Sequence, residues 1–269
     1  IHEDQKIQNN ELNAKGYNII WLNLEEFSDY KKAISSYDKG LEYANLTPND
    51  TLKVWLHNNL GNAYCYRKID FKKGIAHYKK GLDYSQKINN LDEIMYTNLA
   101  IASAYFSIKC YKKGFPFLKA AETAVNRGKE LEAKISLNSL FGSYYAYTKE
   151  FAKAEQSFKE ALRLSGENKP AFLEGHAAEV YDDMSRMYSE TREYEKAYFY
   201  LDKYTELKDK FYNEERTKAV KRAGLKIEID EYKNQIDIAE SEKCIQDKNL
   251  KQSRTVEILF VIVFVILLL

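Results

Sequence analysis

The side chains that most often carry catalysis or bind metals are few in this sequence and do not cluster. Its histidines and cysteines share no spacing typical of a metal site: His2, His57, His77, His176, Cys65, Cys110 and Cys244. His176 and Glu179 come nearest to an acid–base pair, but residues three apart are frequent neighbours on helix surfaces. No G-x-S-x-G, G-x-x-x-x-G-K, H-E-x-x-H or C-x-x-C motif occurs. We therefore predict no catalytic residue, metal site or cofactor, and an enzyme with an unrecognised site is the most remote interpretation.

The charge balance also argues against a nucleic-acid partner. The 269 residues carry a formal net charge of +1, which creates no basic field. The stretch "YKKGF" interleaves aromatic and basic residues as some RNA-binding surfaces do, but the helix packing described next already explains Tyr111 and Gly114. With 45% hydrophobic residues and only 11 glycines and 3 prolines, the chain can bury a large core and is expected to be all-helical.

A repeated pattern of aromatic and small residues predicts the elements of the fold. In residues 140–164, "LFGSYYAYTKEFAKAEQSFKEALRL", apolar residues recur in steps of three and four on both sides of a break at 148–150, as in two short helices. Small residues opposite aromatic ones let two helices pack closely. The aromatic residue that opens the second helix returns about every 40 residues, a period of helical solenoids: Tyr30, Phe71, Tyr111, Phe151 and Tyr194.

Other positions of the repeat follow the same spacing. Three residues after each opening aromatic comes a small residue: Ala33, Gly74, Gly114, Ala154 and Ala197. Seven after it comes a large residue expected to join the two helices: Tyr37, Tyr78, Leu118, Phe158 and Leu201. The first helices carry a large–small pair and then a tyrosine: Leu60-Gly61 with Tyr64, Ile101-Ala102 with Tyr105, Phe141-Gly142 with Tyr145, and Met184-Ser185 with Tyr188. This arrangement resembles the tetratricopeptide repeat (TPR) over residues 12–207, which implies a right-handed α-α superhelix, or solenoid, of about five helix pairs within residues 1–207.

The resemblance also implies where a partner binds, because such solenoids present a concave surface lined mainly by the first helix of each pair. Carried over position by position, it predicts these groove-facing residues: Asn58, Asn62, Leu99, Ser103, Phe106, Ser139, Ser143, Asp182 and Arg186. Relatives that hold a chaperone's C-terminal carboxylate use Lys or Arg there. The second to fourth repeats lack these cations, so that role is not expected. Side-chain amides can still bond the backbone of an extended protein or peptide ligand, and we expect Asn58, Asn62 and Arg186 to matter for binding and hardly for folding.

Two further segments are expected after the solenoid. Residues 208–254 are rich in charges of both signs, and apolar residues in steps of three and four predict a helical stalk, although Gly224 interrupts the helix signal. A single solvated helix and a coiled coil that forms a homodimer both fit this pattern. Residues 258–269, "ILFVIVFVILLL", are apolar throughout, whereas a spanning helix needs about 20 residues. We interpret residues 255–269 as the start of a truncated transmembrane helix, with the membrane as a partner.

The order of these segments resembles the extracytoplasmic sensor region of Bacteroidetes-type membrane-bound histidine kinases and helix-turn-helix transcriptional regulators. The resemblance implies a single-pass protein of the bacterial inner membrane whose periplasmic repeats bind a protein or peptide, with the output domain missing from this fragment. The alternative is a membrane-tethered scaffold or adaptor without signalling output. Lys248, Lys251 and Arg254 precede the apolar segment, and they favour this alternative because positive charge is denser on the cytoplasmic side of a membrane.

Overall fold

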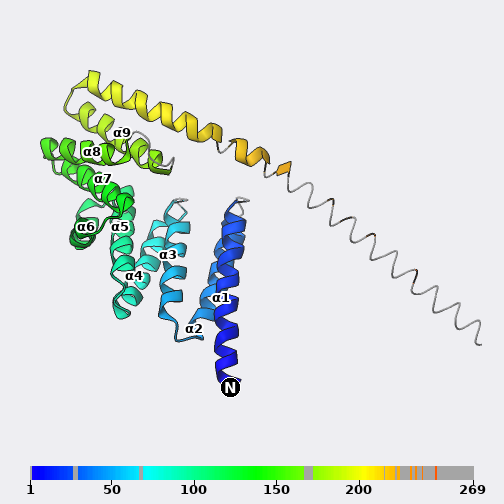
Figure 1. The fold of residues 1–269 in the computed structure, drawn as a ribbon. Coiled ribbons are helices and arrows are strands. Elements are labelled where there is room, and N and C mark those ends of the chain that lie inside the picture. Colours follow the sequence, from blue (N-terminus) through cyan, green and yellow to red (C-terminus); the bar gives the residue numbers. More distant parts are fainter. Residues whose placement is uncertain are drawn as a thin grey trace, which may run out of the picture. The chain divides into compact units, whose positions relative to one another are not determined.

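The structure, a computed structural model, is all-helical wherever it describes the chain, as the sequence predicted (Figure 1). It describes residues 2–26, 30–66, 69–166, 172–214, 216–221, 223–224, 231, 234, 238 and 246. The labelled helices are, in order, α1 (His2–Glu26), α2 (Tyr30–Asn45), α3 (Asp50–Tyr66), α4 (Phe71–Lys87), α5 (Leu91–Ser107), α6 (Tyr111–Arg127), α7 (Leu131–Tyr147), α8 (Phe151–Ser165) and α9 (Phe172–Glu190). A further helix begins at Tyr194.

These helices form consecutive pairs. Each first helix packs on the second helix that follows it, α1 on α2, α3 on α4, α5 on α6 and α7 on α8. Every second helix begins at the aromatic residue that the repeat pattern predicted: Tyr30, Phe71, Tyr111, Phe151 and Tyr194. The prediction of about five helix pairs is therefore confirmed.

The turns inside the third, fourth and fifth pairs share one hydrogen-bonded form. At the end of α5, Lys109 adopts a positive φ of 58°, and the Cys110 N–H donates to the Tyr105 carbonyl over 2.8 Å. This is the Schellman motif, which satisfies carbonyl groups that the end of a helix leaves free. Lys149 (φ 65°) and Arg192 (φ 64°) form the same turn after α7 and α9. One turn type at equivalent places explains why the two helices of these three pairs keep a constant spacing in the sequence.

Small residues allow the two helices of a pair to approach closely. The rings of Tyr78 and Phe158 lie directly on the backbones of Gly61 and Gly142, where an added Cβ would overlap the ring atoms. Both aromatic side chains are almost completely buried, with 2% and 0% of their surface exposed. The alternation of small and aromatic residues is thus confirmed as helix packing.

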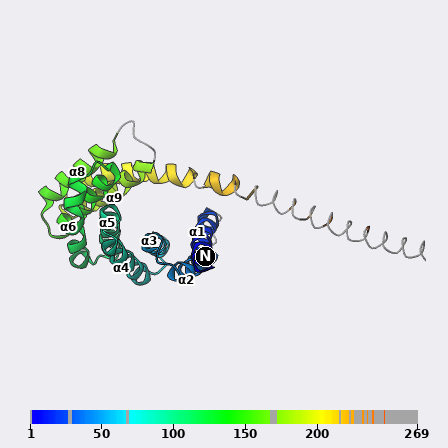
Figure 2. The ribbon, with the colours of Figure 1, turned by 60° about the horizontal axis from the view of Figure 1, so that its bottom comes forward.

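The first helices of successive pairs also pack on one another, and this contact defines an inner face. Contacts join α1 to α3, α3 to α5, α5 to α7 and α7 to α9, whereas among the described residues α2, α4, α6 and α8 make no such contacts with one another. Within the first unit the row of pairs therefore curves toward its first helices (Figure 2). The exposed side of these first helices is called the inner face below.

The fifth pair keeps the predicted register but, within the described part of the chain, lacks a cover. Leu201, expected to join the two helices, is 45% exposed, so that prediction is wrong. In the earlier pairs the residue at this position packs in a cluster with the first helix of the next pair, and no sixth pair lies among the described residues. Tyr200 stacks on Tyr188 at 5.5 Å between centroids, as Phe117 stacks on Tyr105 in the third pair.

The chain divides into a first unit, Ile1–Phe211, and a second unit, Tyr212–Leu269. In the second unit residues 212–214, 216–221 and 223–224 are helical and their side chains are exposed. Gly224 is helical, although it interrupts the helix signal of the sequence. Residues 208–211 of the predicted stalk 208–254 are helical and belong to the first unit. Beyond residue 224, apart from four single helical positions, the predicted stalk and the whole predicted membrane segment 255–269 lie outside the described residues. None of the helices in the described part is both long and apolar enough to span a membrane.

Candidate functional site

The contacts of α3 identify which of its residues face the inner side. Asn58 Nδ2 donates to Thr97 Oγ1 of α5 over 2.9 Å, so Asn58 points toward the next pair. Asn59 Nδ2 donates to Asn18 Oδ1 of α1 over 2.9 Å, so Asn59 points toward the preceding pair. Trp55 precedes these residues by three and four positions and therefore lies on the same stripe of the helix, between the two directions. Its side chain projects from the inner face.

The same argument places Tyr96 on α5. Leu99, three residues later, packs forward in a cluster with Leu137 of α7. Ala100, four residues later, packs backward on a cluster that contains Cys65 of α3. Tyr96 therefore occupies on α5 the place that Trp55 occupies on α3. The spacing of the repeats puts Ser136 and Glu179 at the equivalent positions of α7 and α9.

Trp55 and Tyr96 keep much of their surface exposed, 47% and 40% respectively. Ser136 is half-buried and Glu179 is exposed. Other large side chains of α3 and α5, such as Leu56 and Ile101, are fully buried in the packing of the pairs. The inner face of the second and third pairs thus presents two aromatic rings on neighbouring helices, and the fourth and fifth pairs carry polar residues at the same place.

Two of the predicted groove residues are already hydrogen-bonded within the chain. Asn58 also donates to Glu93 Oε2 over 3.0 Å, and its Oδ1 is buried against Gly81 without a hydrogen-bond partner. Asn62 Oδ1 accepts a hydrogen bond of 2.6 Å from the Tyr78 hydroxyl. The Asn58 amide therefore joins two repeats, and these bonds favour a contribution of Asn58 to folding as well. Binding of a partner by either residue stays a prediction.

Two other predicted groove residues lie in the core. Leu99 and Phe106 are 6% and 7% exposed and belong to the cluster shared by α5, α6 and α7. Their predicted place in the groove is wrong, because the helix is turned so that Tyr96 and Ser103 face inward. Ser103 and Ser139 are half-buried, in keeping with an inner position.

The remaining predicted residues meet between α7 and α9. Ser143 donates its hydroxyl proton to Asp183 Oδ2. Arg186 pairs with Asp183 Oδ1 at 2.5 Å and with Asp182 Oδ2 at 3.0 Å. Burial raises the pKa of Asp183, while Ser143 and Arg186 act to lower it. Beside these groups lies a cavity of about 250 Å³ lined by Ser143, Tyr147, Asp183, Arg186, Met187 and Glu190. The sequence predicted Ser143, Asp182 and Arg186 as groove residues, but not Asp183.

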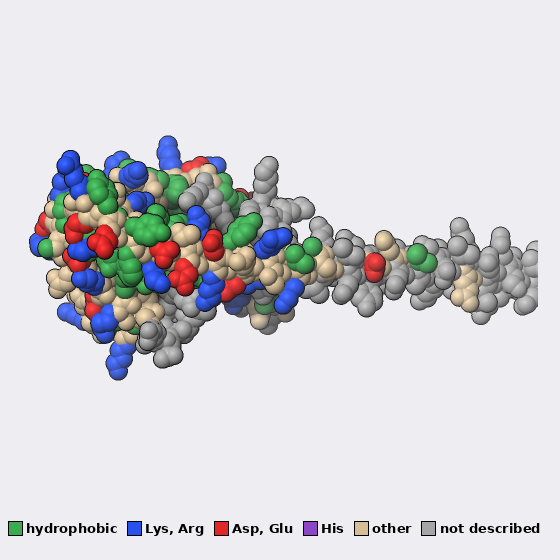
Figure 3. Space-filling model, turned by 90° about the horizontal axis from the view of Figure 1, so that it is seen from above, with side chains coloured by type: hydrophobic (Ala, Val, Ile, Leu, Met, Phe, Trp, Pro, Cys, Tyr) green, Lys and Arg blue, Asp and Glu red, His purple; other side chains and the backbone are tan. Residues whose placement is uncertain are grey.

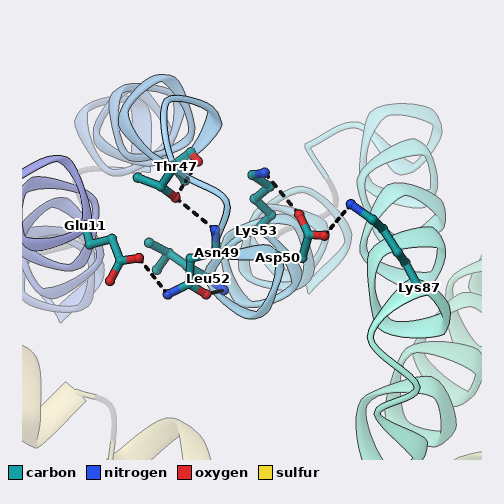
Figure 4. Close-up of polar contacts among 8 residues, drawn as sticks. Glu11, Thr47, Asn49, Asp50, Leu52, Lys53 and Lys87 are labelled. Atoms are coloured by element: carbon teal, nitrogen blue, oxygen red, sulfur yellow. Dashed lines mark hydrogen bonds and ion pairs between the residues drawn. The ribbon is translucent and has the colours of Figure 1, made fainter. Parts of the chain in front are cut away.

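Polar contacts at its N-terminus hold α3, and therefore Trp55, in place (Figure 4). Asn49 caps the helix by accepting from the Leu52 N–H over 3.0 Å, and its amide donates to Glu11 of α1 over 3.1 Å. Asp50, buried at 9% exposure, pairs with Lys87 of α4 at 2.5 Å and with Lys53 at 3.0 Å. These two lysines lower the pKa of Asp50. The first helix of the second pair is thus tied to both of its neighbours.

The two central histidines form a pair away from the inner face. His57 Nδ1 lies 3.1 Å from His77 Nδ1, and the His57 ring also stacks on Tyr84. Burial, with His77 and Lys80 adding to it, lowers the pKa of His57 to about 4, and burial lowers that of His77. Both rings are therefore neutral near pH 7. Within the described residues, no group of three or more His, Cys, Asp or Glu side chains is arranged to hold a metal ion.

A signal for the missed inner positions was present in the sequence. Trp55, Tyr96, Ser136 and Glu179 recur at the repeat spacing, each one turn before a predicted residue. Two of the four are large aromatic residues, although the repeat pattern assigns this position no role in helix packing. Serine and glutamate in the other two repeats show that the fold does not require a ring there. The pattern locates a helix face only to within about one residue, or 100° of rotation about the helix axis. The contacts between helices determine the exact rotation.

No protein-family model matches the sequence, and no curated protein sequence is significantly similar to it. Solved structures are similar in fold. BtubC (BKLC) from P. vanneervenii is 13% identical with a TM-score of 0.55, covering 79% of this chain and 93% of that one. PilF of Pseudomonas aeruginosa is 18% identical with a TM-score of 0.50, covering 79% and 90%. YrrB, described as a TPR protein with an unusual peptide-binding site, is 18% identical with a TM-score of 0.44, covering 77% and 92%. From its five helix pairs and the likenesses to BtubC and PilF, the chain has the tetratricopeptide-repeat fold.

Proposed function

We propose that the first unit is a protein- or peptide-binding module whose inner face holds an extended segment of its partner. The observation that carries this proposal is the exposure of Trp55 and Tyr96, 47% and 40%, at equivalent places on neighbouring first helices. Trp and Tyr are the residue types most enriched among the side chains that dominate binding energy. An exposed apolar ring gains free energy when a partner covers it.

The spacing of the two rings suits an extended chain. Packed helices lie about 8–10 Å apart, and an extended chain rises about 3.3 Å per residue. Side chains about three residues apart in a partner can therefore contact Trp55 and Tyr96 in turn. Half-buried Ser103, Ser136 and Ser139 on the neighbouring stretches of α5 and α7 offer hydroxyl groups that can bond a partner's backbone.

Other exposed aromatic side chains lie outside this arrangement. Tyr194 and Tyr198, 65% and 72% exposed, belong to the second helix of the fifth pair. In the second and third pairs the equivalent position to Tyr198 is Ile75 or Phe115, which packs in the core or against it. The exposure of Tyr198 therefore follows from its place in the last described pair, and it does not recur on neighbouring repeats. This makes Tyr198 a suitable control.

A random display library of peptides about twelve residues long, enough to span the row of first helices, tests this proposal. Selection is carried out on the whole chain, and the affinity of the best peptide is measured by fluorescence anisotropy. We expect Trp55→Ala and Tyr96→Ala each to weaken binding by about thirtyfold, equivalent to about 2 kcal/mol. Tyr198→Ala is expected to bind as the unchanged chain does. Selected peptides that bind equally to both inner-face variants would overturn the proposal.

A role in membrane signalling remains a further proposal. It rests on the predicted stalk and membrane segment, residues 208–254 and 255–269, which lie largely outside the described residues. If the module is a sensor, the stalk couples binding at the repeats to an output domain, and if it is a tethered adaptor, binding alone is its function. Detergent partitioning of the whole chain, compared with a chain ending at Arg254, tests the membrane segment. Equal partitioning of the two would contradict it.

A further inference from the structure

Acidic and basic residues are divided between the two kinds of helix. Among first helices, α5 contains Asp92 and Glu93 and no basic residue, and α9 contains five acidic residues and one arginine. Among second helices, α4 contains five lysines and one aspartate. In Figure 3 Lys and Arg side chains project around the outline of the first unit and also lie among the Asp and Glu side chains in the middle of the view. Since the whole chain has a net charge of only +1, the acidic character of the first helices is a local feature.

Carboxylates gather around one of the two inner aromatic rings. Asp92 and Glu93 lie one turn before Tyr96 on α5, and Glu130 and Glu132 lie at the start of α7. Burial raises the pKa of the Tyr96 hydroxyl, and these four carboxylates raise it further. A cation placed beside the Tyr96 ring would thus meet carboxylates from two neighbouring helices, as well as the face of the ring.

Four carboxylates also lie on or beside the α9 end of the inner face, where they face three cations. Asp182 and Asp183 share the single guanidinium of Arg186. Glu190, 55% exposed, lines the same cavity as Lys109 and forms an ion pair with Lys149 at 3.8 Å. Glu179 projects from the centre of the inner face of this helix and is exposed.

Helix stability explains only part of this distribution. Carboxylates in the first turn of a helix are favourable because they oppose the positive end of the helix dipole, which accounts for Asp92, Glu93 and Glu132. The same reasoning disfavours Glu190, the last residue of α9, and gives no role to Asp182 and Asp183 in the second half of that helix. Their common property is their place on or beside the inner face.

We infer that the partner segment bound on the inner face is basic, with Lys or Arg side chains beside Tyr96 and toward α9, and an apolar side chain against Trp55. This rests on the proposed function and adds the partner's chemistry and direction. Cations of the partner would add positive charge beside the carboxylates along α5, α7 and α9, and these carboxylates would steer its approach. Nucleic acid is disfavoured on this face by the same carboxylates.

The composition of the peptides selected on the whole chain provides the first test. We expect enrichment of Lys and Arg over Asp and Glu among peptides whose binding depends on Trp55. Trp55-dependent peptides that are acidic or neutral would overturn the inference and leave the proposed function intact. A selection that yields no Trp55-dependent peptide would count against the proposed function itself.

Neutralising single carboxylates provides the second test, with the best basic peptide as the probe. Asp92→Asn and Glu190→Gln are each expected to weaken binding about two- to fivefold, the range of an exposed ion pair, and the effect should shrink as salt is raised. The matched controls are Asp83→Asn and Glu195→Gln, exposed acids on second helices, which should leave affinity unchanged. Equal losses in variants and controls would indicate attraction by overall charge and would overturn the assignment to the inner face.

Discussion

The ring of Phe158 packs directly on the backbone of Gly142, so that no side chain fits between α7 and α8 at this point. Gly142→Ala should therefore destabilise the chain by about 1–3 kcal/mol through overpacking, measured by chemical denaturation. Gly175→Ala is the control, because a Cβ there meets nothing within 4 Å and alanine favours a helix by up to about 1 kcal/mol. Stabilisation by both substitutions would show that the close approach of the two helices is wrong.

The Schellman turn after α5 predicts opposite effects of one substitution at two nearby lysines. Lys109 has a positive φ of 58°, a conformation that costs a side chain about 1–2 kcal/mol. Lys109→Gly should therefore be neutral or raise the melting temperature. Lys113 is inside α6, where Lys113→Gly should cost up to about 1 kcal/mol. Equal losses of melting temperature at both positions would contradict the turn geometry.

The Asn58 amide joins the second and third pairs through its bonds to Glu93 and Thr97. Asn58→Ala should lower the free energy of unfolding by about 1–3 kcal/mol, because partly buried partners lose their donor. The control is Asn138→Ala, since the Asn138 amide bonds only to the Lys134 carbonyl of its own helix among the contacts described. A smaller loss for Asn58→Ala than for Asn138→Ala would mean that the amide does not couple the repeats.

The neutral His57–His77 pair makes stability depend on pH. The folded-state pKa of His57, about 4, lies below the unfolded value of 6.5, so between them the unfolded chain binds more protons. The contribution of this histidine is complete above pH 6.5 and is lost as pH falls toward 4. We expect the melting temperature to fall across this window, and to fall less steeply for His57→Gln. Comparing the two proteins cancels the groups that they share, and parallel curves would contradict the assignment.

Much of the fold could be predicted from residue spacing. All five second helices begin at the predicted aromatic residues. The aromatic residue that begins a helix and the small residue three positions later are both needed for close packing of the two helices within a single pair, so their spacing can be recognised in the sequence. The fifth pair shows the limit of this reasoning. Leu201 has the right spacing but is 45% exposed, because in earlier pairs the residue at this position is covered by the first helix of the next pair. Its burial depends on a neighbouring pair and not on the pattern of its own helix.

The candidate site was predictable only in part. The sequence located the inner stripe of the first helices, and it placed Ser143 and Arg186 in it, where they meet at Asp183. It also assigned Leu99 and Phe106 to the groove, although both are in the core. From the sequence alone, a polar residue such as Asn58 is predicted to be exposed. Its hydrogen bond to Thr97 depends on how the third pair packs on the second, which the sequence pattern does not show.

The fluorescence of Trp55 tests the central claim most directly. The sequence has two tryptophans, Trp21 and Trp55, so in a Trp21→Phe chain the emission comes from Trp55 alone. The ring is 47% exposed, and its emission should lie at long wavelength in the free protein. On titration with a peptide selected on the unchanged chain, we predict a shift of the emission to shorter wavelength that saturates together with the anisotropy of the labelled peptide. Saturated anisotropy with an unchanged Trp55 emission would contradict binding on the inner face.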